Sequence, residues 1–273
     1  MSTTPQPVQE SPNAPVLQTL EEGLAILTLN RPDRMNAINT EMAVALNEAL
    51  TALSIDKNVH AVVITGAGKG FCAGGDLKEI WEGRQKNNTE DLEPLLRAGM
   101  GAVLKIRTMR QPVIAAVNGA AAGAGMNIAL AADIRFASET ASFGETFAKV
   151  GLFPDYGGTF FLPQLVGHAK AAELFYTGEM FDAKTALQLG IVNKLVPADK
   201  LLDQAKTFAL GIVHGPRMAS RALKQVLFGN QRAELSKALE YEVEEQMRCF
   251  SSDDCAEGLR AFFEKRKPNF QGK

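Results

Sequence analysis

The chain has 273 residues and a mass of 29.4 kDa, enough to bury a sizeable core in one large domain or in one domain with a small extension. Hydrophobic residues make up 46% and charged residues 22%, which excludes disordered, collagen-like and fibrous chains. The formal charge of -2 shows no basic excess, so we expect no binding to nucleic acid.

The N-terminal residues 1–15 are polar and proline-rich, which predicts a disordered leader. They lack the basic start and apolar stretch of a secretory signal, and the chain holds no apolar run long enough to span a membrane. We therefore expect a cytoplasmic protein with no membrane contact. Three cysteines and three histidines are irregularly spaced, so we expect neither a disulfide framework nor a metal site.

The first half of the chain alternates between strand and helix patterns. Residues 24–29 predict a strand, and apolar residues at three- and four-residue spacing predict a helix over 41–54. A short apolar strand at 61–64 runs into the glycine-rich turn 66–76. The stretch 80–100 is charged and poorly patterned, so we expect either a mobile loop or an exposed helix that shapes a pocket.

The second half repeats this order and then becomes helical. The predicted elements are a helix at 101–108, a strand at 113–117, a glycine-rich turn at 118–125, a helix at 126–132, a strand at 133–137 and a β-like piece at 191–196. Alternating strands and helices predict a layered α/β core, which we place over residues 16–215. Residues 216–273 predict a C-terminal helical region that serves as a lid, as an oligomer contact, or as both.

The two glycine-rich turns each join an apolar strand to a helix, which leaves unpaired backbone N–H groups at a helix start. Phosphate motifs do not fit: Gly70 stands where a P-loop needs Ser or Thr, and Phe71 and Ile128 stand where the dinucleotide pattern needs its last glycine. Two such turns can instead direct two N–H groups at one oxygen as an oxyanion hole. The alternative is a pair of tight turns in which glycine only relieves steric conflict.

Three segments resemble the crotonase (enoyl-CoA hydratase/isomerase) superfamily: FCAGGDLKEI (71–80), PVIAAVNGAAAGAGMNIALAADIRFAS (112–138) and FGETFAKVGLFPDYGGT (143–159). The resemblance covers residues 16–273, and it is closest to the ring-epoxide (1,2-epoxyphenylacetyl-CoA) isomerase and Δ3,Δ2-enoyl-CoA isomerase branch. It implies an α/β fold, a crotonase-like spiral of ββα units with a C-terminal helical region. It also implies assembly as a homotrimer or a dimer of trimers.

The resemblance further implies an acyl-CoA thioester substrate whose carbonyl oxygen is held by the backbone N–H groups of Gly75 and Ala124. The residues that match the family's CoA-binding positions are Arg34, Met35, Ala37, Gly75, Asp76, Leu77, Lys78, Ala124, Phe262 and Lys265. A solvated helix charge is the alternative for Lys265. We expect no metal and no separate cofactor, because the thioester itself accepts the electrons of the reaction.

The acidic residues depart from the pattern of the superfamily's hydratases. Those enzymes use two glutamates, and the matching positions here hold Asn127 and Phe147, which cannot exchange a proton as a carboxylate does. Asp155 matches a position where several isomerases of the superfamily hold Asp or Glu. Its alternative is a turn residue in the Pro-Asp-x-Gly pattern. Aromatic residues cluster around it in the sequence, and if they surround it in space we expect its pKa to be raised.

Three functions remain open. The first is an isomerase that shifts a double bond or rearranges an epoxide, with Asp155 as the proton shuttle. The second is a hydratase-like lyase that acts through an unusual acid such as Glu145, although a surface or helix-cap role fits Glu145 better. The third is a catalytically silent acyl-CoA binding protein.

Overall fold

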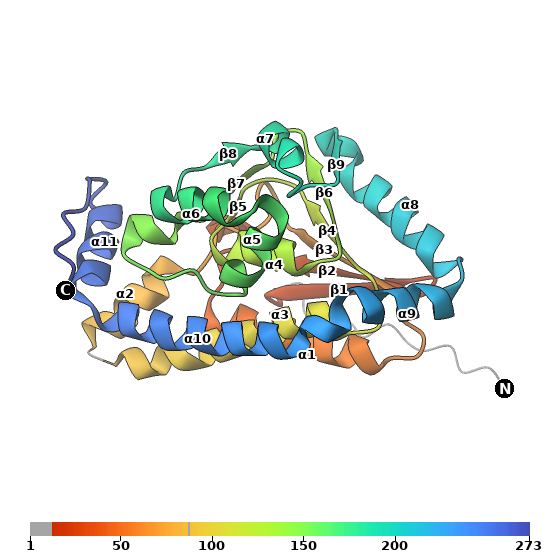
Figure 1. Ribbon diagram of the computed structural model, residues 1–273, viewed down its shortest axis with the longest axis horizontal. Helices are drawn as coiled ribbons and strands as arrows, with labels where there is room; N and C mark the ends of the chain where they lie inside the picture. The colour runs from red at the N-terminus through yellow and green to blue at the C-terminus, as the bar shows by residue number, and fades with distance from the viewer. Residues whose placement is uncertain (1–12, 87) are drawn as a thin grey trace.

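The computed structural model describes residues 13–86 and 88–273 (Figure 1). Residues 1–12 of the predicted leader lie outside the described residues. The main sheet has the strand order β1-β2-β3-β4-β6-β9, with β1 antiparallel to β2 and all later pairs parallel. Its strands are β1 Val16–Glu21, β2 Leu24–Leu29, β3 Ala61–Gly66, β4 Val113–Val117, β6 Ile134–Ser138 and β9 Lys194–Val196.

Helices cover both faces of this sheet, so its central strands are apolar on both sides. One face, which includes Ile26 and Val63, packs against α8 (Leu201–Val213). The opposite face belongs to the large cluster that also contains buried residues of α1 (Thr40–Ile55) and α3 (Glu93–Thr108). Figure 1 shows α8 along one side of the strands and α1 and α3 along another.

A small second sheet stands beside the main one. It pairs β5 (Ala121–Ala122) in parallel with β7 (Ser142–Gly144), which pairs antiparallel with β8 (Phe181–Asp182). The helices around it are α4 Ala124–Ala131, η3 Thr146–Val150, α5 Gly158–Val166, α6 His168–Thr177 and α7 Ala183–Gln188. The remaining short 3-10 turns are η1 Pro32–Arg34, η2 Thr89–Leu92, η4 Ala198–Lys200 and η5 Gly229–Gln231.

Three helices end the chain: α9 (Arg217–Phe228), α10 (Arg232–Ser251) and α11 (Asp253–Phe263). Helix α10 runs beside α3 and also contacts α5, and α11 packs near α2 (Leu77–Gln85) (Figure 1). The C-terminal helices therefore return to the part of the core that carries the glycine-rich turns. Across the described ranges, none of the helices has the length and apolar character that a membrane crossing requires.

The predicted strands at 24–29, 61–64 and 113–117 and the predicted helix at 41–54 all form, within a residue or two. The mobile loop considered for residues 80–100 is wrong for the described part of that stretch. It is helical, and α3 begins at Glu93, well before the predicted start at 101. The reason is an apolar stripe hidden among charges, since Leu92, Leu96 and Val103 are all buried.

Helix α3 carries a glycine at its closest approach to a neighbouring loop. A Cβ added at Gly99 would lie 1.9 Å from Cζ of the Tyr156 ring. We expect Gly99→Ala to lower the free energy of unfolding by about 1–3 kcal/mol, because overpacking outweighs the gain in helix propensity. Denaturant unfolding measures the change.

Gly211 on α8 is the matched control, because a Cβ added there meets nothing within 4 Å. Gly211→Ala should leave stability unchanged or raise it by up to about 1 kcal/mol. Equal effects of the two substitutions would contradict this packing of Tyr156.

Candidate active site

The two glycine-rich turns meet at one edge of the main sheet. Strands β2, β3 and β4 are adjacent and parallel, so the loops that follow them leave the sheet at the same edge. Backbone hydrogen bonds tie these loops together: the Ala73 N–H donates to the Met35 carbonyl (3.0 Å), and the Ala122 N–H donates to the Cys72 carbonyl (3.0 Å). The predicted convergence of the two turns is therefore a consequence of strand order.

Two backbone donors remain free where the turns meet. Gly74 has φ +97°, and a Cβ there would lie 2.9 Å from the Ala122 carbonyl oxygen and 3.9 Å from the Ala124 nitrogen. Glycine permits this approach. Ala124 is the first residue of α4, where the N–H has no partner within the helix. Within residues 13–86 and 88–273, neither the Gly75 N–H nor the Ala124 N–H donates a hydrogen bond.

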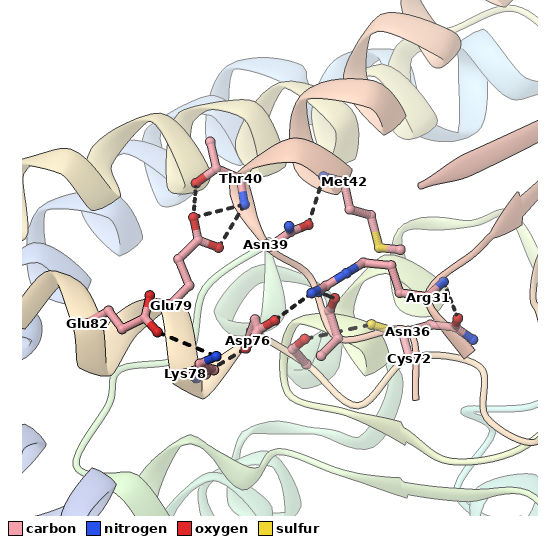
Figure 2. Close-up of polar contacts among 12 residues, drawn as sticks. Arg31, Asn36, Asn39, Thr40, Met42, Cys72, Asp76, Lys78, Glu79 and Glu82 are labelled. Atoms are coloured by element: carbon pink, nitrogen blue, oxygen red, sulfur yellow. Dashed lines mark hydrogen bonds and ion pairs between the residues drawn. The ribbon is translucent and has the colours of Figure 1, made fainter. Parts of the chain in front are cut away.

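Polar contacts hold the loop that follows β2 against the loop that follows β3 (Figure 2). The Arg31 guanidinium donates to Oδ2 of Asp76 (2.8 Å), and Oδ1 of Asp76 accepts the Lys78 N–H at the start of α2 (3.1 Å). Glu79 accepts from both the backbone N–H and the hydroxyl of Thr40. These contacts fix the start of α2 beside the start of α1, as Figure 2 shows.

A cavity of about 500 Å³ opens between these loops, α3 and the C-terminal helices. It is lined by ten of the eleven residues expected at the site: Arg34, Met35, Ala37, Gly75, Asp76, Leu77, Lys78, Ala124, Asp155 and Phe262. Lys265 does not line it and is exposed after the end of α11, so its role in CoA binding stays a prediction. The rest of the lining is mainly apolar and includes Leu96, Leu152 and Phe250.

Asp155 lies in this cavity with 6% of its surface exposed. Its Oδ2 accepts a hydrogen bond from Nε2 of Gln246 (2.9 Å), and its Oδ1 makes none within the described chain. Burial raises the pKa of Asp155 to about 8; the Gln246 hydrogen bond opposes this rise and the nearby charge of Glu242 adds to it. The carboxyl group is therefore buried at the cavity wall, and its pKa lies well above that of a solvated aspartate.

Asn127 and Phe147, which the family resemblance matches to the hydratase glutamates, have other contacts here. Phe147 lines the cavity, and the amide of Asn127 donates to the Asp155 backbone carbonyl (2.7 Å) and to Oε2 of Glu145 (3.4 Å). The surface or helix-cap role expected for Glu145 is wrong, because its exposed fraction is 0% and its side chain caps no helix. Burial raises its pKa well above the usual range, and it does not line the cavity. In the described ranges, no three His, Cys, Asp or Glu side chains are placed to hold a metal ion.

Two site residues on α10 were not predicted from the sequence. Gln246 contacts Asp155, and Glu242 accepts the backbone N–H groups of Gly157 (2.7 Å) and Thr159 (3.0 Å) at the start of α5. Burial raises the pKa of Glu242 to about 7. Their four-residue spacing places them on one helix face. The surrounding tail is so rich in Glu that this spacing does not distinguish them from other polar residues in the sequence.

Comparisons with known proteins identify the family of the chain. The family described as Enoyl-CoA hydratase/isomerase matches residues 19–273. Crotonyl-CoA hydratase from Syntrophomonas wolfei is 37% identical over 254 residues, which is 93% of this chain and 96% of that protein. 1,2-Epoxyphenylacetyl-CoA isomerase from Escherichia coli is 36% identical over 265 residues, 94% of this chain and 98% of that protein.

The fold agrees as well. A crystal structure of an enoyl-CoA hydratase from Mycobacterium avium subsp. paratuberculosis superposes with a TM-score of 0.85 at 32% identity, covering 94% of this chain and 99% of that one. The resemblance noted in the sequence is thus confirmed over nearly the whole chain, together with the expected α/β fold. The chain belongs to the enoyl-CoA hydratase/isomerase family, the crotonase superfamily.

Proposed function

We propose that this enzyme is an acyl-CoA isomerase that converts a 3-enoyl-CoA into a 2-enoyl-CoA or rearranges a ring-epoxide acyl-CoA. One observation carries the proposal: a buried, partly unpaired carboxylate, Asp155, lines the same cavity as the free N–H groups of Gly75 and Ala124. A base beside an oxyanion hole is the arrangement that proton transfer next to a thioester requires.

In the double-bond shift, Asp155 takes a proton from C2 of the 3-enoyl thioester. The electrons of that C–H bond form a dienolate, and its negative oxygen accepts hydrogen bonds from the Gly75 and Ala124 N–H groups. Asp155 then returns the proton to C4, which leaves the double bond between C2 and C3. One base suffices, and each oxyanion donor is worth roughly 3 kcal/mol of transition-state stabilisation.

The other aspartate of the cavity is poorly suited to this task. Asp76 forms an ion pair with Arg31 through Oδ2 and caps α2 through Oδ1, so both of its oxygens have partners. Asp155, by contrast, keeps Oδ1 without a hydrogen-bond partner in the described chain, and burial raises its pKa to about 8. The apolar lining beyond Asp155, with Leu96 and Phe250, suits an apolar acyl group.

Hydratase activity is the second candidate, because most named relatives are hydratases, among them crotonyl-CoA hydratase and a short-chain-enoyl-CoA hydratase from Clostridium acetobutylicum. Its acid would have to be Glu145, which lies outside the cavity lining. A silent acyl-CoA binding protein is the third candidate. Assembly as a homotrimer or dimer of trimers, and the absence of a separate cofactor, stay predictions.

Asp155→Asn removes the proposed base with little change of shape. We expect kcat with 3-enoyl-CoA to fall at least about 100-fold, which is the usual contribution of a general base. Asp203→Asn is the control, because Asp203 is exposed on α8, and its activity should match that of the unmodified protein. If Asp155→Asn keeps half of the turnover with an intact fold, another group is the base.

The pH dependence follows from the protonation state that the reaction needs. The base must be ionised, and burial raises the pKa of Asp155 to about 8. We therefore expect kcat/KM to be low near pH 6, to rise with a midpoint near pH 8 and to level off above pH 9. A steady-state pH profile with 3-enoyl-CoA checks this, and a flat profile from pH 6 to 9 would contradict the assignment.

Crotonyl-CoA separates the three functions. We expect water addition, monitored as the loss of the conjugated absorbance, to be at least about 100-fold slower than isomerisation of 3-enoyl-CoA. The reason is that the second acid of the cavity, Asp76, has both carboxylate oxygens engaged by Arg31 and by the start of α2. Fast water addition would favour the hydratase instead. Tight binding of acyl-CoA without turnover of enoyl, dienoyl or epoxide substrates would favour the silent binding protein.

A further inference from the structure

Gln246 on α10 binds the Asp155 loop at two points. Its Oε1 accepts the backbone N–H of Phe153 (3.0 Å), and its Nε2 donates to Oδ2 of Asp155 (2.9 Å). The Phe153 N–H can only donate, so it requires the amide oxygen on its side. The amide nitrogen therefore faces the carboxylate, and its orientation follows from the contacts on both sides.

An amide nitrogen donates hydrogen bonds and accepts none. The hydrogen bond from Gln246 is stronger to an unprotonated oxygen than to a hydroxyl, so it favours Oδ2 as the acceptor and Oδ1 as the oxygen that takes an arriving proton. Within the described chain Oδ1 has no hydrogen-bond partner, and Asp155 lines the cavity. The two carboxylate oxygens are therefore not equivalent.

We propose that Gln246 is a positioning residue that reserves Oδ2 of Asp155 as a hydrogen-bond acceptor and leaves Oδ1 as the oxygen that carries the proton between substrate carbons. This inference rests on the proposed isomerase function and adds a named atom and a second residue to it. It also makes the C-terminal helix α10 part of the catalytic apparatus.

Three titratable groups lie near Asp155: Glu242 on α10, Glu145 before η3 and the neighbouring Tyr156. The charge of Glu242 raises the pKa of Asp155, whereas the charge of Asp155 raises the pKa of Glu145 and of Tyr156. Gln246 is the side chain that stabilises the Asp155 carboxylate against burial and against the charge of Glu242. Its loss should leave Asp155 protonated over a wider range of pH.

Two variants test the contact. Gln246→Met removes both the donor and the acceptor and introduces no charge, so it is the direct test. Gln246→Glu keeps an acceptor for the Phe153 N–H and replaces the amide donor with a second carboxyl group, whose charge also raises the Asp155 midpoint. Carboxyl carbon NMR of protein labelled in its aspartates follows the titration of Asp155 directly, with the signal assigned by its loss in Asp155→Asn. We expect both variants to raise the Asp155 midpoint by about one to two pH units, the usual effect of a hydrogen bond to a charged group.

Two glutamate variants on the same helix serve as comparisons. Glu242→Gln removes a nearby negative charge, so it should lower the Asp155 midpoint, the opposite direction. Glu244 is exposed on α10, and Glu244→Gln should leave the midpoint unchanged. A role of Gln246 in stability alone would change the melting temperature without moving the Asp155 titration or the acid limb of the kcat/KM profile.

An unchanged Asp155 midpoint in either folded Gln246 variant overturns the proposal. If neither variant folds, Gln246 is a fold anchor, which overturns it as well. Failure of the proposed function looks different: Asp155→Asn then keeps its turnover, while the Gln246 variants still shift the Asp155 midpoint.

Discussion

The rest of the site depends on the burial of the Asp155 carboxyl group. Burial disfavours the charged form, and the hydrogen bond from Gln246 offsets part of that cost, so the pKa of Asp155 settles at about 8. Full solvation would make Asp155 a weak base, and burial without a hydrogen-bond donor would keep its carboxyl group protonated. The balance comes from two distant parts of the chain, because Asp155 belongs to the core and Gln246 to α10.

The helix that supplies Gln246 also holds the loop on which Asp155 lies. Glu242, one turn earlier on α10, accepts two backbone N–H groups at the start of α5, which is where a carboxylate best complements a helix. Tyr156 lies between these anchors with φ +54°, a left-handed conformation that costs energy in a residue with a side chain. Its ring fits against the bare backbone of Gly99, so both anchors and the glycine of α3 keep the loop in place.

The part of the site made of backbone could be predicted from the sequence, whereas much of the part made of side chains could not. Apolar strands followed by glycine-rich turns indicate parallel strand ends that meet at one edge, and the family resemblance implied Gly75 and Ala124 as the donors within those turns; both line the same cavity. The contact of Gln246 with Asp155 depends on how a helix distant in the sequence packs on the core. No local sequence pattern distinguishes Gln246 from its polar neighbours. The sequence left residues 80–100 open between a mobile loop and an exposed helix for a related reason, since charged residues hide the apolar stripe of the helices that form there.

Overall similarity does not decide between hydration and isomerisation, because the chain is 37% identical to a hydratase and 36% identical to an isomerase. In the proposed mechanism, a sheet edge with free N–H donors suits both reactions, so the distinction rests on a few side chains. Phe147 makes one hydratase position apolar, and Asn127 turns the other into a donor to the Asp155 carbonyl. In the proposed reaction, the residue that replaces one acid therefore helps to hold the acid that remains.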